Sequence, residues 1–245
     1  MARIETGNPL DRRTLLKLTS GAAVVGGAYM AGITTSLPAG AAGGDTGARP
    51  VRQFRALWIA SVVNIDWPSK MGLTAIQQQQ EYLAWLDLAK ELNMNAVISQ
   101  VRPTADSFWP SLHEPWSKYL TGTQGKNPGY DPLAFQVASA HERNLEYHAW
   151  FNPYRVSMQP DGKELVADHP AKQHPDWVWP YGGKLYYDPG LPEVRAFVQR
   201  AMLDAVRRYD IDAVHFDDYF YPYPVGGADY PDAATYAKHG NGQPI

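Results

Sequence analysis

Four short apolar segments, each separated from the next by a helix-like pattern, most constrain what this chain can fold into. They are 54–62 (FRALWIASV), 95–101 (NAVISQV), 145–151 (LEYHAWF) and 212–218 (DAVHFDD). Their length and their content of aliphatic and aromatic residues are typical of buried strands. Strands that alternate with helices are parallel and are joined by right-handed crossovers. The pattern therefore leaves two architectures, a (β/α)8 barrel and a doubly wound sheet.

The loops favour the barrel. Thr74 with Gln77, Asp131 before Pro132, and Pro192 are helix-start signals, and they place the helices shortly before the next strand. The connections that follow the strands are instead long and aromatic, as in barrels, where these loops build the active face. No glycine-rich phosphate turn follows the first strand, unlike in dinucleotide-binding sheets. We predict an α/β fold of the (β/α)8 TIM-barrel type, of which this chain covers about the first four β/α units.

The first residues have the features of an export signal. Arg12 and Arg13 precede a weakly hydrophobic stretch rich in Gly and Ala, which ends in small residues. We predict a twin-arginine export signal over 1–41, a Gly-rich linker over 42–52 and the N-terminal part of the barrel over 53–245. The apolar stretch is short and interrupted, so we expect no membrane span after signal removal and a periplasmic, cell-wall or extracellular location.

Composition narrows the ligand class. The chain has no Cys, so disulfides cannot stabilise it outside the cytoplasm and a packed core must do so. Its formal net charge is −3, and loss of the basic signal makes the remainder more acidic, which argues against nucleic acid as a partner. Eight Trp and fifteen Tyr favour a neutral, ring-shaped ligand instead.

The fourth strand supplies the candidate catalytic residues. Side chains alternate along a strand, so His215 and Asp217 point into the barrel mouth, while Asp218 turns toward the loop. Asp is also common in turns, so a simple strand end is the alternative. An inward His beside an inward Asp favours a site, because each buried polar group costs about 1–3 kcal/mol when unpaired. We predict Asp217 as the reacting carboxylate, with His215 and Asp218 beside it.

Polar and aromatic residues also end the other three strands. In the third, Trp150 offers an aromatic face to a sugar ring and Asn152 an amide to its hydroxyls, with Tyr154 and Arg155 just beyond. The predicted substrate-binding residues from the remaining strand ends are Asp66, Arg102, Asp106 and Tyr219. We expect Arg102 to pair with Asp106 or with a carboxylate at the barrel mouth. The coincidence of such clusters at all four strand ends indicates a carbohydrate site.

Several of these segments resemble the glycosyl hydrolase-like 10 barrel family of bacterial envelope proteins. The resembling stretches run in order from about 54 to 224 and include FRALWIASVVNIDWPS, VISQVRPTADSFWPSLHEPWSKYLTG, HAWFNPYR and YDIDAVHFDDYFYP. The resemblance implies a (β/α)8 fold and glycoside hydrolysis, with at least one relative acting on peptidoglycan glycan strands stripped of their stem peptides. By analogy with retaining glycosidase barrels, it also implies that Asp217 is the nucleophile.

The chain departs from that family in length. Members continue well beyond the motif around Asp217, so we expect this chain to be the first half of a barrel. Glycoside hydrolysis normally needs a second carboxyl as general acid, and the candidates within the chain are Asp66, Asp106 and Asp218. A half-barrel exposes its edge strands and its inner face, so we also predict self-association through these open edges.

Two other functions fit parts of the pattern. A non-catalytic glycan-binding barrel would carry the same aromatic clusters without requiring Asp217. A metal-dependent polysaccharide deacetylase would use adjacent Asp residues with a His pair, but the His spacings 141/148 and 169/174 do not provide the expected pair. We therefore predict a hydrolase that acts on cell-envelope polysaccharide and uses no metal or other cofactor.

Overall fold

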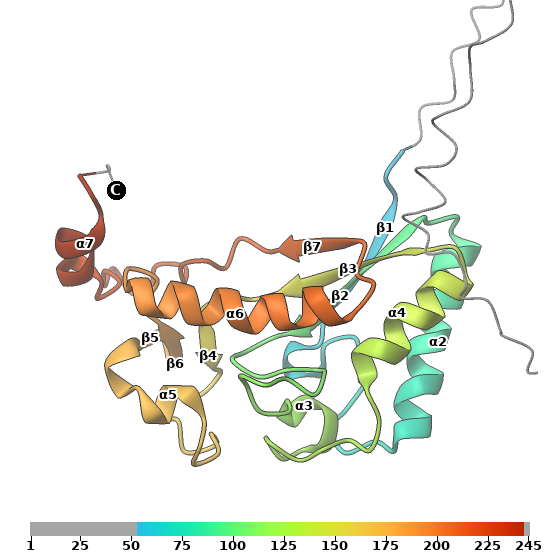
Figure 1. Cartoon of the computed structure of the whole chain (residues 1–245), viewed down its shortest axis with the longest axis horizontal. Helices are drawn as coiled ribbons and strands as arrows, with labels where there is room; N and C mark the ends of the chain where they lie inside the picture. Colours follow the sequence, from blue (N-terminus) through green and yellow to red (C-terminus); the bar gives the residue numbers. More distant parts are fainter. Residues whose placement is uncertain (1–52, 243–245) are drawn as a thin grey trace, which may run out of the picture. The chain divides into compact units, whose positions relative to one another are not determined.

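The computed structural model describes residues 53–242, so the predicted export signal and the predicted linker both lie outside the described residues. The main sheet has four parallel strands in the order β1-β2-β3-β7 (Figure 1). Their bounds are β1 Ala56–Ile59, β2 Ala96–Arg102, β3 Glu146–Phe151 and β7 Ala213–Phe216. All four predicted strands are therefore present, and their order is that of consecutive β/α units in a partial (β/α) barrel.

Three long helices connect these strands, namely α2 (Ala75–Glu91), α4 (Pro132–Glu142) and α6 (Pro192–Arg208). The predicted helix starts are confirmed in detail. Thr74 and Gln77 form a reciprocal capping box, and the Asp131 side chain accepts a hydrogen bond from the backbone N–H of Ala134. Helices α2 and α4 lie side by side against β2 and β3 (Figure 1).

The main core lies between the sheet and these helices. Alternate strand residues, such as Val97, Tyr147 and Ala149, pack against Leu86 of α2 and Val137 of α4. The remaining described helices are short: the 3-10 turns Val62–Asn64 and Pro175–Trp177, and α3 (Lys118–Thr121), α5 (Pro170–Gln173) and α7 (Ala233–His239). With one face of each strand fixed against helices, the strand residues in between must point to the other face of the sheet.

A second sheet occupies the connection between β3 and α6, which the sequence predicted as a loop. It is antiparallel, in the order β4-β6-β5, with β4 Arg155–Ser157, β5 Val178–Tyr181 and β6 Lys184–Tyr187. Gly182 and Gly183 both have positive φ, which closes the tight turn between β5 and β6. A separate core cluster, including Val156, Leu185 and Phe197, joins this small sheet to α6.

The face of the main sheet opposite the helices is partly open. Trp58 on β1, which points to this face, is 51% exposed. On the helix-covered face, Phe216 at the end of the edge strand β7 is 39% exposed. Within the described residues, β1 pairs only with β2 and β7 only with β3. Both edges are thus open in this part of the chain, and association through them stays a prediction.

Among residues 53–242, none of the helices combines the length and the apolar character needed to cross a lipid bilayer.

Candidate active site

Asp217 directly follows β7, and both of its carboxylate oxygens are held by donors. The Trp150 indole N–H donates to Oδ2 at 3.2 Å, and the backbone N–H of Tyr219 donates to Oδ1 at 3.1 Å. Asp217 is only partly buried, so a ligand can still approach it. The structure therefore brings two other predicted residues, Trp150 and Tyr219, into contact with the Asp217 carboxylate at the end of the sheet.

His215 lies one layer below Asp217 on the same side of the sheet. Strand register aligns Gln100 with Trp150 and Trp150 with His215, so these side chains form a row across three strands. The His215 ring packs edge-on against Trp58 at 4.8 Å and against Trp150 at 6.0 Å between ring centroids. Partial burial lowers the pKa of His215, and the charge of Asp217 opposes that shift.

Trp58 also packs against Trp150 and His215, and the sequence did not predict it as a site residue. Its ring centroid is 5.2 Å from that of Trp150. Period-two alternation from Leu57 and Ile59, whose side chains pack toward the helices, would have placed Trp58 on the same face as the site.

Arg155 lies behind the site, at the start of β4. It is 5% exposed, and its Nε and Nη2 both donate to the carbonyl of Pro103, at 3.0 and 2.8 Å. Its guanidinium carbon is 5.4 Å from the centroid of the Tyr219 ring. Burial lowers the pKa of Arg155, and the Asp217 carboxylate is the charge that most opposes this shift. Arg155 thus supports the Asp217 cluster from inside the protein, although it was predicted as a substrate contact.

Asp218 follows Asp217 and makes a different contact. It is exposed, and it accepts a hydrogen bond of 2.5 Å from the hydroxyl of Tyr223. The Tyr223 ring in turn packs edge-on against the Tyr219 ring, with centroids 4.9 Å apart. Asp218 therefore fixes an aromatic side chain beside the site.

Arg102 pairs differently from the prediction. Its Nε and Nη2 donate to the two carboxylate oxygens of Glu114, at 2.7 and 2.5 Å, and both side chains are fully buried. It also donates to the carbonyls of Asn152 and Pro153. Burial alone would lower the pKa of Arg102, but the charge and hydrogen bonds of Glu114 outweigh it, so the pKa is raised. The expected pairing with Asp106 or a mouth carboxylate is wrong, because Glu114 from the long loop after β2 takes that place.

Asn152 and Tyr154 are held inside the turn that follows β3. Asn152 is fully buried, and its Oδ1 accepts a hydrogen bond from the backbone N–H of Arg155 at 2.9 Å. Tyr154 packs against the second core cluster. The structure thus gives both residues contacts that shape the turn, and their contact with substrate stays a prediction.

Asp66 and Asp106 do not meet Asp217. Asp66 Oδ2 accepts a hydrogen bond from the backbone N–H of Ala60 at 2.8 Å, which closes the turn after β1. Asp106 is 1% exposed, and burial raises its pKa to about 6, although Thr104 and Ser117 lower it. Neither carboxylate therefore contacts Asp217.

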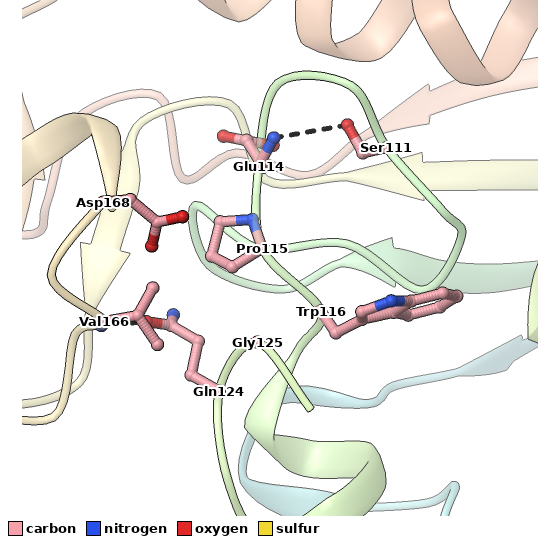
Figure 2. A pocket seen from close by; sticks show the side chains of 8 residues that line it. All are labelled: Ser111, Glu114, Pro115, Trp116, Gln124, Gly125, Val166 and Asp168. Carbon is pink, nitrogen blue, oxygen red and sulfur yellow. Dashed lines mark hydrogen bonds between the residues drawn. The ribbon is translucent and has the colours of Figure 1, made fainter. Parts of the chain in front are cut away.

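A cavity of about 460 Å³ opens between the loop after β2 and the segment before α5. Figure 2 shows the Asp168 carboxylate turned toward Pro115 in this cavity. Its lining residues are Ser111, Glu114, Pro115, Trp116, Gln124, Gly125, Val166 and Asp168. None of them belongs to β7 or to the turn after it, so the cavity is separate from the cluster around Asp217.

Within residues 53–242, no three His, Asp or Glu side chains are grouped so that they could hold a metal ion. His141 instead contacts Asp212 through Nε2 at 2.7 Å, and His148 contacts Glu146 at 3.1 Å.

Four parallel strands with intervening helices form part of a (β/α) barrel, and an oriented carboxylate follows the carboxyl end of its last strand, where barrels carry their active sites. A model of the family described as Glycosyl hydrolase-like 10 matches residues 53–245, and the chain belongs to this family.

Two curated relatives agree with this assignment. The chain is 58% identical to Glycosyl hydrolase YngK of Bacillus subtilis (strain 168) over 190 residues, which is 77% of this chain and 37% of YngK. It is 39% identical to Glycosyl hydrolase DigH of Escherichia coli (strain K12) over 219 residues, which is 83% of this chain and 50% of DigH. Among solved structures, the galactosidase domain of alpha-galactosidase-sucrose kinase, AgaSK, has a TM-score of 0.44 at 14% identity, over 69% of this chain and 21% of its own. The chain thus spans half or less of the length of these curated relatives.

Proposed function

We propose that this chain carries part of the active site of a glycoside hydrolase that acts on cell-envelope polysaccharide, with Asp217 as the nucleophile. The substrate we propose is peptidoglycan glycan strands free of stem peptides. The observation that carries the proposal is the Asp217 carboxylate, which is partly exposed and held by Trp150 and by the backbone of Tyr219. Family membership supports the reaction class.

Two hydrogen bonds support the proposed role of Asp217. Donors on both carboxylate oxygens restrict the rotation of the side chain, so it enters the reaction already aligned. We propose that Asp217 attacks the anomeric carbon and displaces the oxygen of the leaving sugar, which takes a proton from the general acid. Trp150, which is only 7% exposed, orients the carboxylate through its indole N–H. His215 packs against Trp58 and Trp150 below Asp217. Because burial lowers its pKa, His215 is neutral at pH 7 and does not compete as a cation for the carboxylate.

The general acid is a separate question. Retaining enzymes place their two carboxyl groups about 5–5.5 Å apart and inverting enzymes about 6.5–9.5 Å apart. Asp66 is engaged by the backbone of Ala60 and Asp106 is buried, so Asp218 is the most accessible of the three predicted candidates. A glycan-binding protein without catalysis is the second candidate function, because Asp66 is held in a turn and Asp106 is buried, which leaves only Asp218 exposed among the three candidates.

The test is cleavage of peptide-free glycan strands by the chain without residues 1–41, alone and within a longer protein that continues it, with released sugars identified by mass spectrometry. Asp217→Asn is expected to lower the rate at least a thousandfold, since removal of a nucleophile leaves only binding and electrostatic assistance. Asp210→Asn, in an exposed aspartate before β7, is the matched control and should keep the wild-type rate. Normal cleavage by Asp217→Asn would contradict the assignment of the nucleophile. If the wild-type chain binds but never cleaves, and Asp217→Asn binds equally well, the glycan-binding function is the better account.

We also propose that the protein reaches the cell envelope through the twin-arginine pathway. The support is the pair Arg12 and Arg13 followed by a weakly hydrophobic stretch. Replacing both arginines with lysine should retain the chain in the cytoplasm, which cell fractionation would detect. Unchanged export of that variant would contradict this route.

A further inference from the structure

Two tyrosines after β7 form an aromatic surface next to Asp217. The rings of Tyr219 and Tyr223 meet edge-on, and the Arg155 guanidinium lies against Tyr219 on the buried side. Tyr223 is 56% exposed, so much of its ring is available to a ligand. Residues 219–223 leave the strand directly after Asp217, which keeps this surface beside the carboxylate.

The exposed ring is nevertheless fixed in place. The Tyr223 hydroxyl donates to Asp218 at 2.5 Å. That hydrogen bond is the main reason why the pKa of Tyr223 is raised, and the charges of Asp218 and Asp217 act in the same direction. The hydroxyl therefore stays protonated and bonded. A side chain whose orientation is already set loses less conformational freedom when a ligand binds.

We propose that Tyr219 and Tyr223 form a subsite that binds one pyranose ring of the glycan beside Asp217, and that Asp218 is the residue that positions Tyr223. A pyranose ring has an apolar face of C–H groups and an edge of hydroxyls. An exposed tyrosine ring matches the first and the free lone pairs of Asp218 match the second. The inference rests on the proposed function, since it takes the ligand to be the polysaccharide whose bond Asp217 cleaves.

A neighbouring tyrosine, Tyr221, is exposed and anchored in a similar way but lies in a different aromatic cluster. Tyr221 is also exposed, at 46%, and its hydroxyl donates to Asp232 at 2.7 Å. Its ring packs against Tyr230, which contacts Tyr181 and Tyr186 of the small sheet. Tyr221 thus has the same residue type, a similar anchor and a similar exposure, but its ring contacts are with a different cluster. It is the matched control.

The experiment measures binding of the tetramer of N-acetylglucosamine by calorimetry, in an Asp217→Asn background so that the probe is not consumed. Tyr223→Ala should weaken binding about tenfold, which corresponds to about 1.4 kcal/mol. Tyr221→Ala should change it less than twofold. Tyr223→Phe keeps the ring but removes its anchor, so it should give an intermediate loss of about threefold. Asp218→Ala removes the same anchor together with the oxygens offered to the sugar hydroxyls, so its loss should be at least as large. Thermal unfolding of each variant checks that it is folded.

Two outcomes overturn the subsite. One is equal affinity of Tyr223→Ala and Tyr221→Ala, and the other is no measurable binding by the Asp217→Asn parent. If Asp218→Ala abolishes cleavage but leaves binding unchanged, Asp218 reacts directly and the positioning role is wrong. Failure of the proposed hydrolysis has a different signature. In that case, the wild-type chain cleaves nothing, while Tyr223→Ala still binds about ten times more weakly than its parent.

Discussion

The buried ion pair between Arg102 and Glu114 gives the sharpest test of how this fold is held together. Both oxygens of Glu114 accept from the Arg102 guanidinium, and neither side chain reaches solvent. Glu114→Gln removes the negative charge and leaves Arg102 as a buried cation. Breaking a buried pair in this way costs about 3–5 kcal/mol. The glutamine oxygen still accepts one hydrogen bond, and the carbonyls of Asn152 and Pro153 remain, so we expect the low end, about 3 kcal/mol.

The assay is unfolding in urea, followed by tryptophan fluorescence. With a slope of about 2 kcal/mol per M, a loss of about 3 kcal/mol lowers the midpoint by about 1.5 M. Glu164 is the matched control, because it also contacts a cation at 2.5 Å, that of Lys118, but both side chains are about a quarter exposed. Solvent-exposed pairs contribute less than about 1 kcal/mol, so Glu164→Gln should lower the midpoint by less than about 0.5 M.

A double variant tests whether the loss of stability comes from the uncompensated charge of Arg102. Replacing Arg102 and Glu114 together with methionine removes both charges, so no uncompensated ion remains. We expect this variant to be more stable than Glu114→Gln. Equal midpoints for Glu114→Gln and the wild type, or a double variant less stable than Glu114→Gln, would refute the reasoning.

Two further predictions concern pH. Burial raises the pKa of Asp106 from 3.8 to about 6, so its ionised form weakens the folded state by about 3 kcal/mol above pH 6 and by little below pH 4. Asp106→Asn should therefore stabilise the chain more at pH 8 than at pH 4 in urea unfolding, and an equal effect at both values would contradict this. His169 is buried with Nε2 bonded to the carbonyl of Ala105, and burial lowers its pKa. The stabilising contribution of neutral His169 is present above pH 6.5, where this side chain is neutral in the unfolded chain as well. It is lost as the pH falls below that value, because the unfolded chain then takes up a proton on His169 more readily. His169→Gln should therefore flatten the stability curve below pH 6.5, measured by thermal unfolding.

The strands were predictable because their signal is local. An apolar run of four to eight residues, rich in β-branched and aromatic side chains and bounded by helix signals, favours a strand on local grounds. The same holds for α6, which begins at the predicted Pro192 and buries Val194, Phe197 and Val198 on one face. The small sheet β4-β6-β5 lacks such a signal, since its strands are short and Pro180 interrupts one of them.

The site was predictable to the extent that strand alternation determines it. Alternation placed His215, Asp217 and Trp150 on one face, and the structure has them in contact. It could not find Glu114, because that residue lies in a long loop and meets Arg102 only through tertiary folding. Burial was equally invisible for Asn152 and Asp106, which are 0% and 1% exposed although both lie beyond the ends of their strands.

The long excursion between β3 and β7 also has a consequence for how the chain folds. The Asp212 side chain accepts a hydrogen bond from the backbone N–H of Tyr147, 65 residues away, and the next residue begins β7. Pairings so distant in sequence form slowly, because the intervening chain must first be brought together. We expect β1, β2 and β3 to associate early and β7 to join them late. Asp217 would then be the part of the site that a growing or refolding chain acquires last.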